Sequence, residues 1–261
     1  MQQRNAVYTV VFAAAVCLVC SILVTSSAVS LRERQDVNKL LDKQRNVLQA
    51  AGMLKPGEVL SEAEVQQRFA SFKPVVINLA DGAEQPDVDP ESVEPRKMVA
   101  DPEQSHEVPD NLAQVRRVAN ETVIYKLVND AGEVQMLVLP VHGKGLWSTL
   151  YGFLALSADL QTIKGLTFYD QKETPGLGGE VDNPRWKALW PGRKAFDDDW
   201  NVKIEVIKGT AGPPEQDPYH VDGLSGATIT SRGVSALLHF WLGEEGFGPY
   251  LENYRQSRSA S

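Results

Sequence analysis

The chain has 261 residues, of which 43% are hydrophobic, and its formal net charge is −8 at pH 7. This length and apolar content suit one medium-sized domain or a domain with appendages. No Lys- and Arg-rich run interrupts the acidic balance, and this argues against nucleic acid as a partner, because nucleic-acid binding rests on clustered basic side chains.

A long apolar segment follows a short N-terminal tail at residues 1–6. Residues 7–29 contain no charged side chain, and about 20 apolar residues in a helix are enough to cross the hydrocarbon core of a bilayer. We therefore expect one transmembrane helix at 7–29. A cleavable signal peptide is the alternative, since Ser26-Ser27-Ala28 imitates a cleavage site. Either way the rest of the chain is expected to be exported, but flanking charges do not decide the orientation.

Residues 30–120 are expected to form membrane-proximal helices and an acidic, proline-rich excursion. Apolar residues at helical spacing predict a helix over 37–51, ended by Gly52. A capping box at Ser61–Glu64 predicts a second helix, with an apolar face that reaches Phe72.

Pro74 is expected to end this second helix, and a strand is expected at 75–79. Residues 81–111 are dominated by Asp, Glu and Pro, which is typical of a long surface segment outside the core.

From residue 121 onward the pattern changes to strands and turns. The expected strands are residues 122–128, 134–141, 149–156, 162–169 and 202–207. A short helix is expected after Pro184, and a strongly amphipathic helix that contains Val234 and Trp241 is expected to end near Gly243. Strand hairpins with segregated helices predict an α+β fold, an antiparallel sheet with packed helices preceded by the transmembrane helix.

A small-residue loop leads into the amphipathic helix at residues 221–231. Gly223, Gly226 and Ala227 let a bulky group approach the backbone. Thr228 and its polar neighbours lie where the helix begins, and the unpaired N–H groups of a helix start attract anions. From the residues alone, an ordinary loop with a Ser/Thr helix cap is the favoured explanation of this segment.

The order of residues in the loop is more specific than its composition. Asp222, two variable residues, Ser225, Gly226, Ala227 and Thr228 resemble the acceptor motif of flavin transferases, in which FMN is transferred from FAD to the last threonine as a phosphoester. The whole chain resembles the family of C subunits of bacterial sodium-pumping NADH:quinone oxidoreductases, and the runs at 73–82 and 169–178 support this.

The resemblance implies that Thr228 carries covalent FMN on an FMN-binding domain at residues 121–255. It also implies a single-pass protein of the bacterial inner membrane with a periplasmic domain, matured by an extracytoplasmic flavin transferase and assembled with other membrane subunits of the complex. The chain would then be an electron relay for sodium transport. No G-x-G-x-x-G follows a strand, so NADH oxidation and quinone reduction are expected on the partner subunits, and no catalytic residue is expected here.

Noncovalent contacts to the flavin are expected from three short segments. The candidates are Glu173, Thr174, Gly176 and Leu177 in one loop, Leu146 and Trp147 in a second, and Lys208 and Gly209 in a third. Each has an ordinary alternative: a tight turn for the first loop, a core tryptophan for the second and a solvated lysine for the third.

Other functions are compatible with parts of the sequence. The G subunit of the related ferredoxin/NAD electron-transport complex shares the acceptor motif. An exported serine hydrolase would use Ser225, but the usual order of Ser, acid and His is not met. A membrane-tethered binding module would hold no flavin. The four histidines have no metal-ligand spacing, and both cysteines, Cys17 and Cys20, lie in the apolar segment, so no metal site is expected.

Overall fold

The computed structural model of the protein describes residues 6–55 and 57–259. The chain divides into two compact units, Met1–Lys43 and Gln44–Ser261. Helix α1 (Ala6–Ala50) belongs to both and is continuous, because its sequence contains no proline or glycine to interrupt it. The expected helix at 37–51 is therefore the end of α1. Within α1, the 26 residues Val7–Arg32 form a segment long and apolar enough to cross a membrane.

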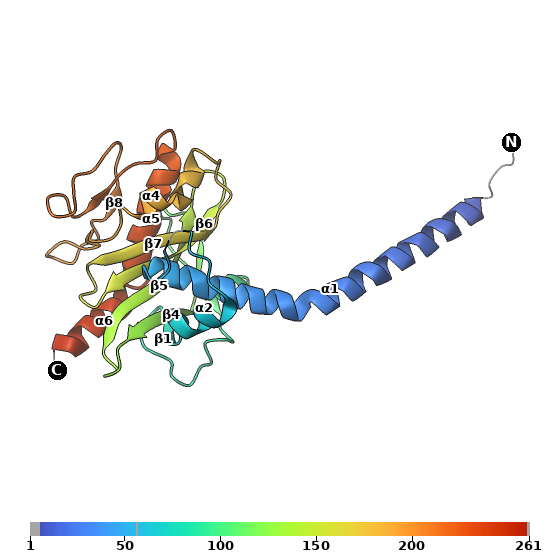
Figure 1. Ribbon diagram of the computed structural model, residues 1–261, viewed down its shortest axis with the longest axis horizontal. Coiled ribbons are helices and arrows are strands. Elements are labelled where there is room, and N and C mark those ends of the chain that lie inside the picture. The colour runs from blue at the N-terminus through green and yellow to red at the C-terminus, as the bar shows by residue number, and fades with distance from the viewer. Residues whose placement is uncertain (1–5, 56, 260–261) are drawn as a thin grey trace. The chain divides into compact units, whose positions relative to one another are not determined.

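The second unit contains the sheet and the remaining helices (Figure 1). Its strands are β1 (Phe72–Asn78), β2 (Ser105–Glu107), β3 (Arg117–Ala119), β4 (Glu121–Val128), β5 (Val134–Lys144), β6 (Thr149–Ser157), β7 (Ile163–Asp170), β8 (Glu205–Val206) and β9 (His220–Val221). Its helices are α2 (Glu62–Phe69), α3 (Pro95–Met98), the 3-10 turn η1 (Gly178–Asp182), α4 (Pro184–Lys187), α5 (Thr228–Leu242) and α6 (Gly248–Ser259).

A five-stranded sheet in the order β1-β4-β5-β6-β7 organises this unit, and every neighbouring pair is antiparallel. The predicted α+β class and both predicted hairpins are confirmed. Strand β1 precedes residue 121, the expected start of the flavin domain, and yet it forms an edge of the same sheet. The short pairs β2–β3 and β8–β9 lie outside this sheet.

Helices cover both faces of the sheet. On one face α5 approaches so closely that a Cβ on Gly143 would lie 2.5 Å from Cβ of Leu237. On the other face the last turns of α1 cross β7, where a Cβ on Gly165 would overlap the carbonyl oxygen of Ala50. Because glycine has no Cβ, these two positions let helix and sheet pack in direct contact.

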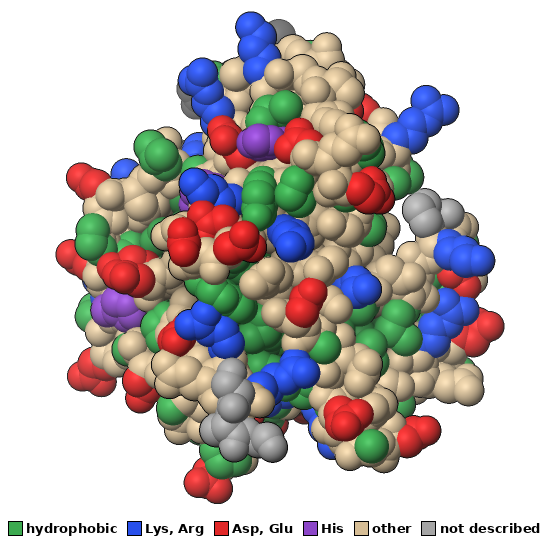
Figure 2. Space-filling model, turned by 90° about the vertical axis from the view of Figure 1, so that its left-hand side faces the viewer, with side chains coloured by type: hydrophobic (Ala, Val, Ile, Leu, Met, Phe, Trp, Pro, Cys, Tyr) green, Lys and Arg blue, Asp and Glu red, His purple; other side chains and the backbone are tan. Residues whose placement is uncertain are grey.

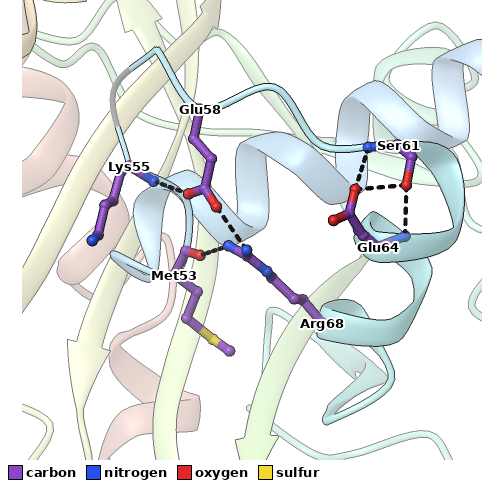
Figure 3. Close-up of polar contacts among 6 residues, drawn as sticks. All are labelled: Met53, Lys55, Glu58, Ser61, Glu64 and Arg68. Atoms are coloured by element: carbon purple, nitrogen blue, oxygen red, sulfur yellow. Dashed lines mark hydrogen bonds and ion pairs between the residues drawn. The ribbon is translucent and has the colours of Figure 1, made fainter.

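The segment between α1 and α2 is held by charged side chains (Figure 3). Arg68 donates to the carbonyl of Met53 at 2.8 Å and pairs with Glu58 at 2.6 Å. The predicted capping box is present: Ser61 Oγ accepts from Glu64 N, and the Glu64 carboxylate accepts from Ser61 N at 2.8 Å. Helix α2 therefore begins where the sequence predicted.

Two predicted elements are wrong in extent. Helix α2 ends at Phe69, and both Phe72 and Pro74 belong to β1. Proline is tolerated there because β1 is an edge strand, whose outer side needs no ladder hydrogen bond. The strand expected at 202–207 is reduced to β8, because the amides of Lys203 and Ile204 both donate to the carbonyl of Ala195 instead of to a ladder.

Residues 81–111 are mostly exposed, as expected, but they include α3 and β2. Val93 and Ser105 in this segment are buried. Strand β3, strand β9 and helix α6 have no counterpart among the predicted elements.

A half-buried histidine on β5 makes the stability of the sheet sensitive to acid. His142 stacks on Tyr151 at 5.4 Å and packs on Trp241 at 4.7 Å. Burial first, and then the nearby Arg96 cation, lowers the pKa of His142 to about 4. The native ring therefore stays neutral at a pH where the unfolded chain, with a His pKa of about 6.5, takes up a proton.

We expect this difference to remove stability as the pH falls from about 6.5 to 4, by up to about 3 kcal/mol. Urea unfolding at pH 7.5 and pH 5 should show a larger loss for the wild type than for His142→Phe, which keeps the stacking and cannot titrate. Equal losses of unfolding free energy in the two proteins would show that His142 does not cause the sensitivity to acid.

Candidate functional site

The acceptor motif presents its last threonine at the start of a helix. Thr228 is the first residue of α5 and is exposed, as are Ser225 and Gly226. The helix cap is the buried Ala227, which offers no side-chain oxygen to the first-turn amides. Gly226 has a φ of +72°, a conformation that favours glycine. The motif thus places a hydroxyl beside the uncapped amides of a helix start, which suits an anionic group.

The acceptor loop is tied to its surroundings by Asp222 and Leu224. The Asp222 carboxylate accepts from the backbone N–H of Ala211 at 2.9 Å, and its carbonyl accepts from Nε1 of Trp186 at 2.9 Å. The N–H of Leu224 donates to Ser231 Oγ at 3.0 Å. The Asp222 side chain therefore holds the shape of the loop in this structure.

The third predicted segment runs alongside the acceptor loop. The N–H of Gly223 donates to the carbonyl of Gly209 at 2.9 Å, and a Cβ on Gly223 would overlap the carbonyl oxygen of Ile207. This contact brings exposed Lys208 next to the motif. A cation there is suitably placed to neutralise a phosphate on the loop.

The loop 174–177 touches the acceptor loop from another side. Its turn is closed by the carbonyl of Thr174, which accepts from the N–H of Leu177 at 3.1 Å, and Gly176 has a φ of +76°. A Cβ on Gly226 would lie 2.9 Å from Cδ2 of Leu177. Leu177 therefore sits against the motif.

Glu173 is the buried acid of the site, with 5% of its surface exposed. Its carboxylate accepts hydrogen bonds from the backbone N–H groups of Leu146, Trp147 and Ser148 at 3.2, 2.9 and 3.0 Å, and from the hydroxyl of Thr230 at 2.7 Å. Burial by itself raises the pKa of this carboxyl, but the hydrogen bonds from Thr230 and the three amides outweigh it and hold the pKa below its usual value. Glu173 is therefore an anion in the native protein.

Large apolar side chains stand exposed on the segments that meet at the acceptor. Their exposed fractions are 42% for Leu146, 68% for Trp147, 43% for Leu177 and 56% for Ile229. Trp147 is thus not the core tryptophan that the ordinary alternative supposed. Exposed apolar surface beside a helix start suits a ligand with a flat aromatic part and an anionic part.

Thr230, Trp186 and Gly178 shape the site but were not among the predicted site residues. A Cβ on Gly178 would lie 2.6 Å from Thr230 Oγ1 and 2.7 Å from Glu173 Oε2. The repeated glycines after Pro175 are the one sequence signal of this crowding. The pairings of Glu173 with Thr230 and of Asp222 with Trp186 join residues far apart in the sequence, and no local pattern predicts them.

The hydrolase alternative fails on geometry. His239 is eleven residues beyond Thr228 on α5, a rise of about 16 Å. Its Nε2 lies 2.9 Å from the carbonyl oxygen of Ile204. A general base must be within hydrogen-bond reach of its nucleophile, and the imidazole of His239 contacts the Ile204 carbonyl instead.

Charges of both signs alternate on the face shown in Figure 2, without a continuous basic stripe. Within residues 6–55 and 57–259, no three His, Cys, Asp or Glu side chains gather as a metal site requires.

The comparisons with known proteins agree with the geometry. The FMN-binding domain family matches residues 145–243, which include the acceptor loop and the loops at 145–148 and 173–179. The chain is 45% identical to the C subunit of the Na(+)-translocating NADH-quinone reductase of Pseudomonas aeruginosa over 98% of this chain and 99% of that protein. The chain belongs to this C-subunit family.

Further members and solved structures support this membership. The C subunit of Yersinia pestis is 45% identical over 92% of this chain and 90% of that protein. The crystal structure of NqrC from Shewanella oneidensis has a TM-score of 0.76 and 36% identity, covering 85% of this chain and 99% of that one. The crystal structure of the C subunit from Parabacteroides distasonis has a TM-score of 0.64 and 26% identity, covering 85% of this chain and 96% of that one. The interpretation as a C subunit thus prevails over the interpretation as a G subunit.

Proposed function

We propose that this member of the C-subunit family carries FMN through a phosphoester to Thr228 and relays electrons within a sodium-translocating NADH:quinone oxidoreductase. The observation that carries the proposal is the exposed Thr228 hydroxyl at the uncapped start of α5, surrounded by exposed apolar side chains. FMN supplies one- and two-electron chemistry when bound.

The residues around Thr228 have distinct parts in this proposal. The first-turn amides of α5 and Lys208 attract the phosphate, while Leu146, Trp147 and Leu177 provide apolar surface for the ring system. Covalent attachment prevents loss of the cofactor from an exported domain. The protein part therefore sets the position and the electrostatic surroundings of the carrier.

The place of the chain in the cell is part of the proposal. Val7–Arg32 anchors it in the bacterial inner membrane by a single span, and the domain with Thr228 lies on the periplasmic side. A flavin transferase in that compartment attaches the FMN, and the other membrane subunits of the complex exchange electrons with it. The span, the acceptor motif and membership of the C-subunit family support this arrangement.

Peptide mass spectrometry tests the proposal. After co-expression with a flavin transferase, the tryptic peptide 209–232, bounded by Lys208 and Arg232, should carry the mass of one FMN and fluoresce yellow-green. The purified chain should oxidise NADH negligibly, because no nucleotide fingerprint is present. An unmodified peptide, or substantial NADH oxidation by the chain alone, would refute this division of labour.

A further inference from the structure

The carboxylate of Glu173 joins three separate segments. Oε1 accepts from the backbone of Trp147 and Ser148 in the loop 145–148, and Oε2 accepts from Thr230 on α5. Glu173 itself begins the third segment, the loop 173–177. With 5% of its surface exposed, this one residue links the parts of the site that are far apart in sequence.

Two glycines, Gly145 and Gly178, leave room for the carboxylate of Glu173. A Cβ on Gly145 would lie 2.7 Å from Oε1, and a Cβ on Gly178 would lie 2.7 Å from Oε2. Real Cβ atoms essentially never come this close to another heavy atom, so a side chain at either glycine would require a shift. On its own backbone side, the N–H of Glu173 donates to Gln171 Oε1 at 2.7 Å, and Gln171 Nε2 donates to Asp182 Oδ2 at 2.8 Å. The carboxylate of Glu173 is thus enclosed by its donors and the two glycines, and the backbone of Glu173 is held by Gln171.

Each linked segment carries part of the surface around Thr228. The loop 145–148 carries Leu146 and Trp147, the loop 173–177 carries Leu177, and the first turn of α5 carries Thr228 itself. The exposed side chains Leu146, Trp147 and Leu177 therefore differ in place from the Glu173 carboxylate, which is buried behind them and joins the segments that carry them. With four donors at 2.7 to 3.2 Å, the carboxylate is committed to the protein.

From this geometry we propose that Glu173 is a positioning residue, which fixes the walls around Thr228 and places a permanent negative charge behind them. The inference rests on the proposed function and deepens it. A negative charge near the flavin opposes the uptake of electrons. Glu173 therefore lowers the reduction potential of the bound FMN while holding its apolar walls in place.

The test uses the full-length chain co-expressed with a flavin transferase. Glu173→Gln keeps the size of the side chain and removes the charge, so redox titration should give a midpoint potential above that of the wild type. Thr230→Val removes one donor to the carboxylate and keeps the charge, so its potential should shift less. Glu205→Gln is the matched control, because Glu205 is exposed on β8, and it should match the wild type.

A second readout does not involve the flavin. In the Thr228→Ala background, Glu173→Ala should accelerate hydrogen exchange of the amides of residues 146–148 about tenfold or more, because these amides lose their acceptors. Glu173→Gln should accelerate the exchange of at least one of these amides, because its NH2 group replaces one of the two acceptor oxygens. The Gln variant remains informative if the Ala variant does not fold. The corresponding Glu205→Gln variant should leave this exchange unchanged.

The outcomes separate the two proposals. A wild-type peptide 209–232 without FMN would refute the proposed function, and the exchange experiment would still decide the positioning role of Glu173. A flavinylated Glu173→Gln protein with the potential of the wild type would overturn the electrostatic part. Unchanged exchange at 146–148 in Glu173→Gln would overturn the positioning role.

Discussion

Replacement of Thr228 by alanine is expected to abolish covalent FMN attachment completely. The proposed phosphoester needs the Thr228 oxygen. Thr230, the next threonine in the motif segment, is fully buried and donates its hydroxyl to Glu173 at 2.7 Å, so it cannot substitute as an acceptor. The intact mass of Thr228→Ala, after co-expression with a flavin transferase, should equal that of the unmodified chain, and in-gel flavin fluorescence should vanish.

Two variants control this experiment. Thr228→Ser restores a hydroxyl at the start of α5 and should recover part of the attachment. Thr210→Ala removes an exposed threonine of the same tryptic peptide and should be flavinylated like the wild type. FMN-sized added mass that persists in Thr228→Ala would contradict the attachment site.

Truncation of Leu154 to alanine is expected to lower the free energy of unfolding by about 2–5 kcal/mol. Leu154 is fully buried on β6, and register pairs it with Leu139 on β5 and Leu166 on β7. These three leucines form one row across the middle of the sheet. Packed neighbours on both sides prevent the cavity from closing, so the transfer and cavity costs add.

Urea unfolding of the full chain in detergent would measure this loss. Leu112→Ala provides the matched control, because 89% of Leu112 is exposed, and it should change the free energy of unfolding by less than about 0.5 kcal/mol. Similar midpoints for the two variants would show that the row of leucines does not form the centre of the core.

Elements with strong local signals were predicted closely. The hairpin between β4 and β5 follows from Gly132, which has a φ of +81°, at the end of a turn sequence between two apolar runs. Helix α2 starts at its predicted capping box, and α5 ends at its predicted glycine. The weaker apolar pattern at 202–207 did not give a full strand. Within it, Val202 forms an isolated bridge with Phe196, and Glu205–Val206 pair with β9.

The candidate site was predicted as a set of short motifs without a spatial arrangement. Motif order predicted Thr228 as the acceptor, and the glycine-rich loop suggested Leu177, which does lie against Gly226. Glu173 was predicted as a flavin contact from its loop alone, and the structure adds that its carboxylate is buried among protein donors. This orientation depends on Thr230, 57 positions away in the sequence, and no local pattern encodes such a pairing.

Thr228 illustrates what the sequence by itself determined. The prediction that it is the acceptor, the apolar span at Val7–Arg32 and the α+β class each depend on residues that are adjacent or regularly spaced, so they can be read along the chain. The tertiary structure alone decided that β1 closes the edge of the sheet and that Glu173 joins three segments around Thr228. These contacts join distant parts of the chain, because burial and hydrogen bonding in the packed sheet and helices select them and no local pattern along the chain does.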